Sequence, residues 1–101
     1  MKEANEIRSD LRQIRYYYNY VKGKCIGEKE AIKNDIDDLV NLYNDAVKTA
    51  PVKLYEVYCS LYVEGHTIVS LASKWGYSVQ AISVRNRQLV RFFENQFNKE
   101  V

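Results

Sequence analysis

The spacing of apolar residues in the first half of the chain is the feature that most constrains the fold. Between residues 7 and 25 the intervals alternate between four and three, at Ile7, Leu11, Ile14, Tyr18, Val21 and Cys25. This spacing puts one stripe on a helix and does not fit the alternation of a half-buried strand. It is also the heptad spacing of a coiled coil. We therefore expect a first helix of about six turns that pairs with another helix.

The same spacing recurs after an interruption. Gly23 and Gly27 fall in the stretch 22–27 and predict a loop there. Beyond this loop the apolar stripe continues at Ile32, Ile36, Leu39, Tyr43 and Ala46. Residues 1–48 are therefore expected to form a coiled-coil-like helical hairpin, with pairing between two chains into a dimer as the alternative.

Charge is divided along the same boundary. Residues 1–24 hold six basic and three acidic residues, whereas residues 25–50 hold three basic and six acidic ones. The two segments, of net charge +3 and −3, can attract each other within one chain or across a dimer. Residues 79–93 carry Arg85, Arg87 and Arg91 and no acid, which predicts a polyanion-binding region there.

Composition supports an all-α fold class. The chain has 101 residues with one proline and four glycines, fewer turn formers than a β-sandwich needs. It contains no run of 18 apolar residues, and its N-terminus lacks the apolar stretch of a signal peptide. We expect a cytoplasmic protein that does not enter a membrane.

The sequence offers little for catalysis or metal binding. Cys25 and Cys59 lack CxxC spacing, and with the single His66 they supply too few ligands for structural zinc. No nucleophile paired with a base and no phosphate-cradling glycine loop is visible. We expect no cofactor, no metal and no enzymatic activity.

The second half, residues 51–101, predicts three helices. Pro51 suits the start of the first helix, whose apolar face holds Leu54, Tyr58, Leu61 and Tyr62 and which stops at Gly65. Thr67 can cap a short helix from Ile68 to Trp75, which buries Ile68, Leu71, Ala72 and Trp75. Gly76 can take a positive φ, and Ser78 can cap a last helix to about Phe93 with the buried stripe Ile82, Leu89, Val90 and Phe93.

A short helix, a glycine turn, a capping serine and a basic helix together predict a helix-turn-helix, whose second helix enters the major groove of DNA. Ala72 is small where the two helices approach, and Trp75 and Ile82 fill the angle between them. At 100° per residue, five side chains lie opposite the buried stripe, namely Gln80, Ser83, Val84, Arg87 and Arg91.

Each outward side chain has a predicted role. Gln80 can pair with an adenine edge, Val84 can contact a thymine methyl, and Arg87 can reach guanine or phosphate. The helix starts at Thr67 and Ser78 can bind phosphate, with Lys74, Arg85 and Arg91 as flanking cations.

These residues resemble a known family. The segments Leu61 to Thr67, Leu71-Ala72, Trp75 to Val79 and Leu89-Val90 look like region four of RNA polymerase sigma factors. They look still more like small phage transcriptional regulators of the ArpU and RinA kind, in which a coiled-coil-rich half precedes such a module. The resemblance covers roughly residues 51–93.

The resemblance implies sequence-specific binding of double-stranded DNA in transcription control, with Val79, Gln80, Ser83 and Val84 at base-reading positions. Two features depart from the family. Arg85 and Asn86 stand where an aliphatic residue is usual, and the acidic pair often found near Val69 and Ser70 is missing. A contact with RNA polymerase therefore does not follow from the resemblance.

Two alternative functions fit the same elements. One is a phage small-terminase-like packaging protein, which also joins a helix-turn-helix to oligomerising helices, and the other is a sigma-like protein-interaction module that does not bind DNA. A dimer through the N-terminal helices is expected because two linked modules read two half-sites. The cluster Tyr16, Tyr17, Tyr18 and Tyr20 packs on the second half or across an oligomer interface, or it stacks on nucleic acid with Arg12 and Arg15.

Overall fold

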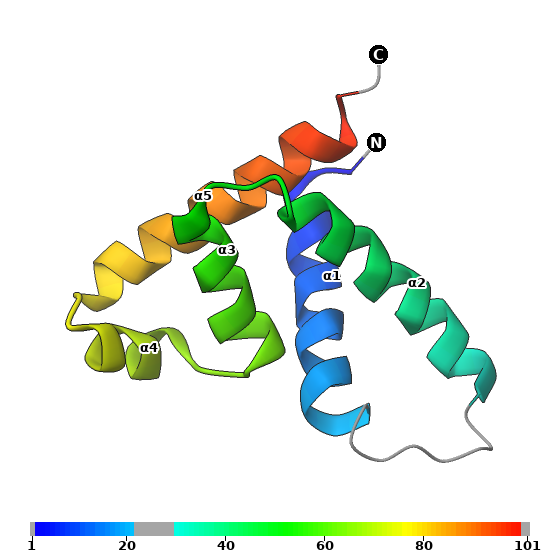
Figure 1. Ribbon diagram of the computed structural model, residues 1–101, viewed down its shortest axis with the longest axis horizontal. Helices are drawn as coiled ribbons and strands as arrows, with labels where there is room; N and C mark the ends of the chain where they lie inside the picture. Colours follow the sequence, from blue (N-terminus) through cyan, green and yellow to red (C-terminus); the bar gives the residue numbers. More distant parts are fainter. Residues whose placement is uncertain (1, 22–29, 100–101) are drawn as a thin grey trace.

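The computed structural model describes residues 2–21 and 30–99, and these contain helices and no strand (Figure 1). The elements in chain order are α1 (Ala4–Tyr16), η1 (Tyr17–Val21), α2 (Glu30–Val47), α3 (Val52–Tyr58), η3 (Cys59–Val63), α4 (Ile68–Trp75) and α5 (Val79–Phe97). The segments η1 and η3 are π-helical continuations of α1 and α3. The all-α prediction is confirmed for these residues, while the predicted loop at 22–27 and Cys25 lie outside them. No helix in the described part of the chain is long and apolar enough to span a membrane.

The helices pack around one centre (Figure 1). α1 and α2 contact each other and run in opposite directions. α5 contacts α1, α2, α3 and α4, and η3 also contacts α1. α4 lies at the start of α5, at the end of the molecule away from both termini (Figure 1). The α4–α5 pair is thereby held on the remaining helices.

The buried residues of both halves form a single cluster. From α1 it contains the predicted seam residues Ile7, Leu11 and Ile14, each at most 1% exposed. From α5 it contains the whole predicted stripe Ile82, Leu89, Val90 and Phe93. Residues 1–48 and 51–101 therefore share one core.

The buried face of α2 differs from the predicted stripe. Val40, Tyr43 and Val47 are buried, whereas the predicted Ile36, Leu39 and Ala46 are half-buried at its edge. The reason is that α2 packs on α3 and α5 as well as on α1. The Tyr43 ring meets Phe93 and Phe97 edge-on, with ring centroids 4.8 and 4.9 Å away. Predicted Ile32 lies outside the residues whose side chains are described.

Two predicted helix boundaries also shift. Pro51 is the residue that caps α3, which begins at Val52, and the Pro51 carbonyl accepts from Leu54 and Tyr55 amides. α5 continues past the expected end at Phe93 to Phe97. Because Phe97 packs on Tyr43 of α2, tertiary contact supports this last turn.

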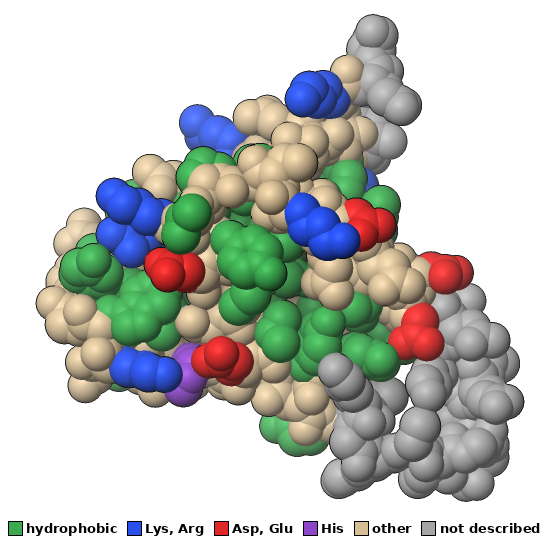
Figure 2. All heavy atoms as spheres, in the orientation of Figure 1, with side chains coloured by type: hydrophobic (Ala, Val, Ile, Leu, Met, Phe, Trp, Pro, Cys, Tyr) green, Lys and Arg blue, Asp and Glu red, His purple; other side chains and the backbone are tan. Residues whose placement is uncertain are grey.

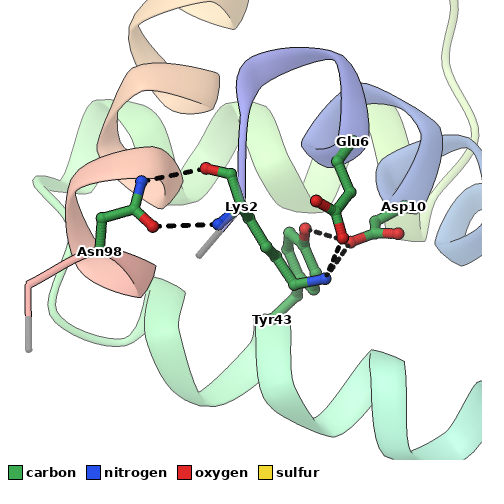
Figure 3. A network of polar contacts seen from close by, with 5 residues as sticks. All are labelled: Lys2, Glu6, Asp10, Tyr43 and Asn98. Carbon is green, nitrogen blue, oxygen red and sulfur yellow. Dashed lines mark hydrogen bonds and ion pairs between the residues drawn. The ribbon is translucent and has the colours of Figure 1, made fainter.

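A polar network joins the two ends of the chain to α2 (Figure 3). Asp10 is 8% exposed and accepts hydrogen bonds from the Tyr43 hydroxyl at 2.6 Å and the Lys2 ammonium at 2.9 Å. The Lys2 backbone exchanges two hydrogen bonds with the Asn98 side chain, each of 3.0 Å. Burial, and then the hydrogen bond to Asp10, raise the pKa of Tyr43. A buried carboxylate paired in this way fixes α1 against α2 and α5.

Candidate nucleic-acid interface

The turn between α4 and α5 is built on Gly76. Its φ of +75° lies in the left-handed region, which residues with a Cβ atom enter only at a cost. The Tyr77 amide donates to the Ala72 carbonyl at 2.9 Å, and the Gly76 amide donates to the Ser73 carbonyl at 3.4 Å. These bonds form a Schellman motif and satisfy the last carbonyls of α4. The predicted conformation of Gly76 is confirmed.

Both predicted N-terminal caps are present. The Thr67 hydroxyl accepts from the Ser70 amide, and the Ser78 hydroxyl accepts from the Ala81 amide, each at 3.0 Å. Each cap satisfies one of the amides that a helix start leaves unpaired. Gly65, just before α4, also has the positive φ expected of a helix stop. The local signals in this half of the sequence therefore specify where α4 and α5 begin.

The contact between α4 and α5 is apolar. Leu71 and Ala72 of α4 are buried, as is Ile82 of α5. Trp75 and Ile68, which were expected to be buried, are half-buried. The Trp75 ring lies edge-on to Tyr77 with centroids 6.3 Å apart. Trp75 therefore lies at the margin of the contact between α4 and α5. The turn at Gly76 places Tyr77 beside it.

The outer surface of α4 and α5 carries the predicted DNA-binding side chains. Eight of the ten are exposed, namely Thr67, Lys74, Ser78, Val79, Gln80, Val84, Arg87 and Arg91. Ser83 is half-buried, at the edge of this surface. Gln80, Arg87 and Arg91 make no hydrogen bond or ion pair with other residues in the ranges 2–21 and 30–99. Their polar groups are available to a ligand.

Arg85 lies on a different surface from Arg87. Its guanidinium carbon lies 4.6 Å from the centre of the Tyr77 ring, a cation–π contact. Together with Glu56 and Trp75 these two residues line a shallow groove of about 270 Å³. Figure 2 shows basic, acidic and hydrophobic side chains gathered over this α3–α4–α5 region. The Arg85 side chain is half-buried, which suits an aliphatic stem packed on the protein with the charged head near solvent.

Asn86 forms a hydrogen bond with a tyrosine of η3. The Tyr62 hydroxyl of η3 donates to the Asn86 side-chain oxygen at 2.5 Å. Asn86 continues the spacing of Ile82, Leu89 and Phe93, so it lies on the inner side of α5. A polar residue in an apolar stripe needs a partner, and that signal could have identified a hydrogen bond across the core.

The tyrosine cluster divides between packing and exposure. Tyr17 and Tyr18 pack against the core. The Tyr18 hydroxyl accepts from the Asn44 amide at 3.0 Å, and Asn44 also accepts from Tyr58 at 2.7 Å. Tyr16 and Tyr20 are each 59% exposed, and their ring centroids lie 5.2 Å apart. Half of the cluster is therefore structural, and the other half is a surface pair.

The described residues hold no group of three or more metal-ligating side chains. His66 lies 3.4 Å from the Glu64 carboxylate, and Cys59 is a free thiol whose pKa burial raises.

Comparison with models of protein families, with curated proteins and with solved structures finds no match to this chain.

Proposed function

We propose that this protein is a sequence-specific DNA-binding regulator of transcription that inserts the first half of α5 into the major groove. The observation that carries the proposal is the capped and fixed α4–Gly76–α5 pair, whose outer surface presents unpaired Gln80, Arg87 and Arg91. A helix followed by a tight turn and an exposed second helix is the arrangement of the helix-turn-helix. The resemblance to sigma region four and to phage regulators points the same way.

The side chains divide into two roles. Val79, Gln80, Ser83 and Val84 read base edges, with Gln80 on adenine and Val84 on a thymine methyl. Thr67, Lys74, Ser78 and Arg91 contact phosphates along the groove. Arg87 is placed to reach guanine or a phosphate. Arg85 acts at the edge of the interface, because its stacking on Tyr77 draws it to the groove beside Glu56.

In this proposal the N-terminal hairpin supports the α4–α5 pair. Two copies of the protein bind two half-sites on the DNA. Because the α1 seam is buried in the core of the chain, we assign the dimer contact to the outer surfaces of the first two helices. Exposed apolar side chains on those surfaces include Leu42, at 42%, and the Tyr16–Tyr20 pair.

The test is selection from a random DNA pool at two salt concentrations, followed by sequencing. The proposal predicts an enriched motif whose affinity falls as salt rises, by about 0.9 in log–log slope for each phosphate contacted. A two-fold symmetric motif supports the dimer. Absence of binding at low salt would instead favour a protein-interaction module, and ring assembly on DNA would favour a packaging protein.

A further inference from the structure

The two flanks of α1 carry opposite charges. Arg8, Arg12 and Arg15 follow one another at intervals of four and three and lie on one side of the buried seam. Glu6 and Asp10 lie on the other side, which faces α2. The helix therefore presents a basic flank, which we define as Arg8, Arg12 and Arg15, to the opposite side of the molecule from its acids.

The acids of α1 have partners other than these arginines. Lys2 pairs with Glu6 at 3.3 Å and with Asp10 at 2.9 Å, and the Tyr43 hydroxyl also donates to Asp10 (Figure 3). Arg12 is exposed and Arg8 half-exposed. Neither forms an ion pair or hydrogen bond with residues in the parts of the chain that the structure describes. Two cations thus remain uncompensated beside one another.

The basic flank borders α4 at one end. The Arg15 guanidinium donates to the Gly65 carbonyl at 3.0 Å, two residues before the Thr67 cap. Gly65 has a φ of +82°, and an added Cβ atom would meet the Asn19 side chain. The chain is therefore pressed closely against the end of α1 as it enters α4. Arg15 fixes this approach and points the flank toward the start of α4.

Helix α1, which carries the basic flank, contacts both η3 and α5. Burial raises the pKa of Tyr62, while the Asn86 hydrogen bond and the positive charges of Arg8, Arg15 and Arg12 act to lower it. The Tyr62 hydroxyl in turn donates to Asn86 of α5. Arg87 is the next residue along α5, and Arg85 lies on the other side of Asn86, over Tyr77. The flank is therefore tied to the start of α4 through Arg15, on a helix that also contacts α5.

We propose that Arg8, Arg12 and Arg15 form a second phosphate-binding surface, which holds the DNA backbone beside the segment that α5 reads. This inference rests on the proposed function. Arginine donates to phosphate oxygens in a planar fork, and such contacts fix the position of a protein on DNA without reading sequence. The N-terminal half of the chain thereby takes part in DNA binding directly.

The test compares two double variants in a fluorescence anisotropy titration with the duplex enriched by selection. Arg8→Gln/Arg12→Gln removes two charges from the flank and leaves the Arg15–Gly65 bond in place. Lys48→Gln/Lys53→Gln also removes two positive charges, from exposed residues that lie outside the basic flank. Circular dichroism and urea unfolding of each variant establish that it folds as the wild type does.

The expected result is weaker binding by the arginine variant to all sequences, with the log–log salt slope reduced by about 1.8, at 0.9 for each phosphate. The ratio of wild-type to variant affinity then falls about 12-fold between 50 and 200 mM salt, because the fourfold change in salt concentration is raised to the power of about 1.8. The lysine variant keeps most of the wild-type slope.

An arginine variant with the wild-type affinity and slope overturns this inference and leaves the proposed function standing. A loss of preference at a single base position also overturns it, because the arginines would then read bases. Absence of DNA binding by the wild-type protein at low salt overturns the proposed function itself.

Discussion

Replacing Gly76 tests whether the α4–α5 turn depends on backbone conformation. An L-residue pays about 1–2 kcal/mol in the left-handed region. A Cβ atom added at Gly76 meets nothing within 4 Å, so no steric cost is added. Alanine also reduces the entropy of the unfolded chain, which offsets roughly 0.4–1 kcal/mol. Gly76→Ala should therefore lower the free energy of unfolding by about 1 kcal/mol.

Urea unfolding followed by circular dichroism measures this change, with Gly76→Asn as the matched control. Asparagine adopts the left-handed conformation more readily than alanine does, so it should cost less. Gly65→Ala should cost more than Gly76→Ala, because the new Cβ atom would also overlap the Asn19 side chain. Equal losses for alanine and asparagine at position 76 would refute the reasoning, since the cost would then not come from φ.

Three further predictions concern the core and the interface. Tyr43→Phe keeps the ring contacts but removes the hydrogen bond to Asp10, which should cost roughly 1.5–3 kcal/mol in urea unfolding at neutral pH. Burial raises the pKa of Tyr43 from its ordinary value of 10.0, so the protonated hydroxyl contributes its full stabilisation below pH 10.0. This stabilisation is lost as the pH rises above that value, because the unfolded chain ionises first. Tyr43→Phe should therefore reduce the fall in the free energy of unfolding at alkaline pH. Leu11→Ala should cost about 2–5 kcal/mol, because Leu11 is 1% exposed within the protomer. Arg87→Ala should weaken DNA binding by about 1–3 kcal/mol with loss of preference at one base if Arg87 reads that base, and uniformly if it contacts phosphate.

Each of these has an outcome that contradicts it. Tyr16→Phe, at an exposed ring, is the control for Tyr43→Phe. Equal losses in the free energy of unfolding would show that the hydrogen bond to Asp10 does not stabilise the fold. A Leu11→Ala protein of unchanged stability would show that α1 does not pack in the core. Unchanged DNA affinity in Arg87→Ala would exclude this side chain from the interface.

The features that the sequence predicted correctly are local ones. The Thr67 and Ser78 side chains each accept from the amide three residues ahead, and Gly76 ends the helix that precedes it. Because these contacts are local, the roles of Thr67, Gly76 and Ser78 could be predicted without knowledge of the fold. The buried stripe of α5 was equally predictable, because helical periodicity fixes which side chains share a face.

The features that were missed depend on contacts between distant segments. The Tyr43–Asp10 bond spans 33 residues, and the Tyr62–Asn86 bond spans 24. The buried face of α2 was misplaced because periodicity shows that a stripe exists but not how many helices it meets. Val40 and Val47 flank Tyr43 in the core for this reason. The basic flank of α1 was visible as a charge excess, whereas the Arg15–Gly65 bond that brings it beside the start of α4 follows only from the packing.

Amide chemical shifts during titration with the enriched duplex test most directly whether DNA lies on the outer surface of α5. The largest changes are expected between Ser78 and Arg91, with residues 38–47 of α2 little affected. Changes gathered instead around Leu42 and Tyr55, or no change at low salt, would contradict it.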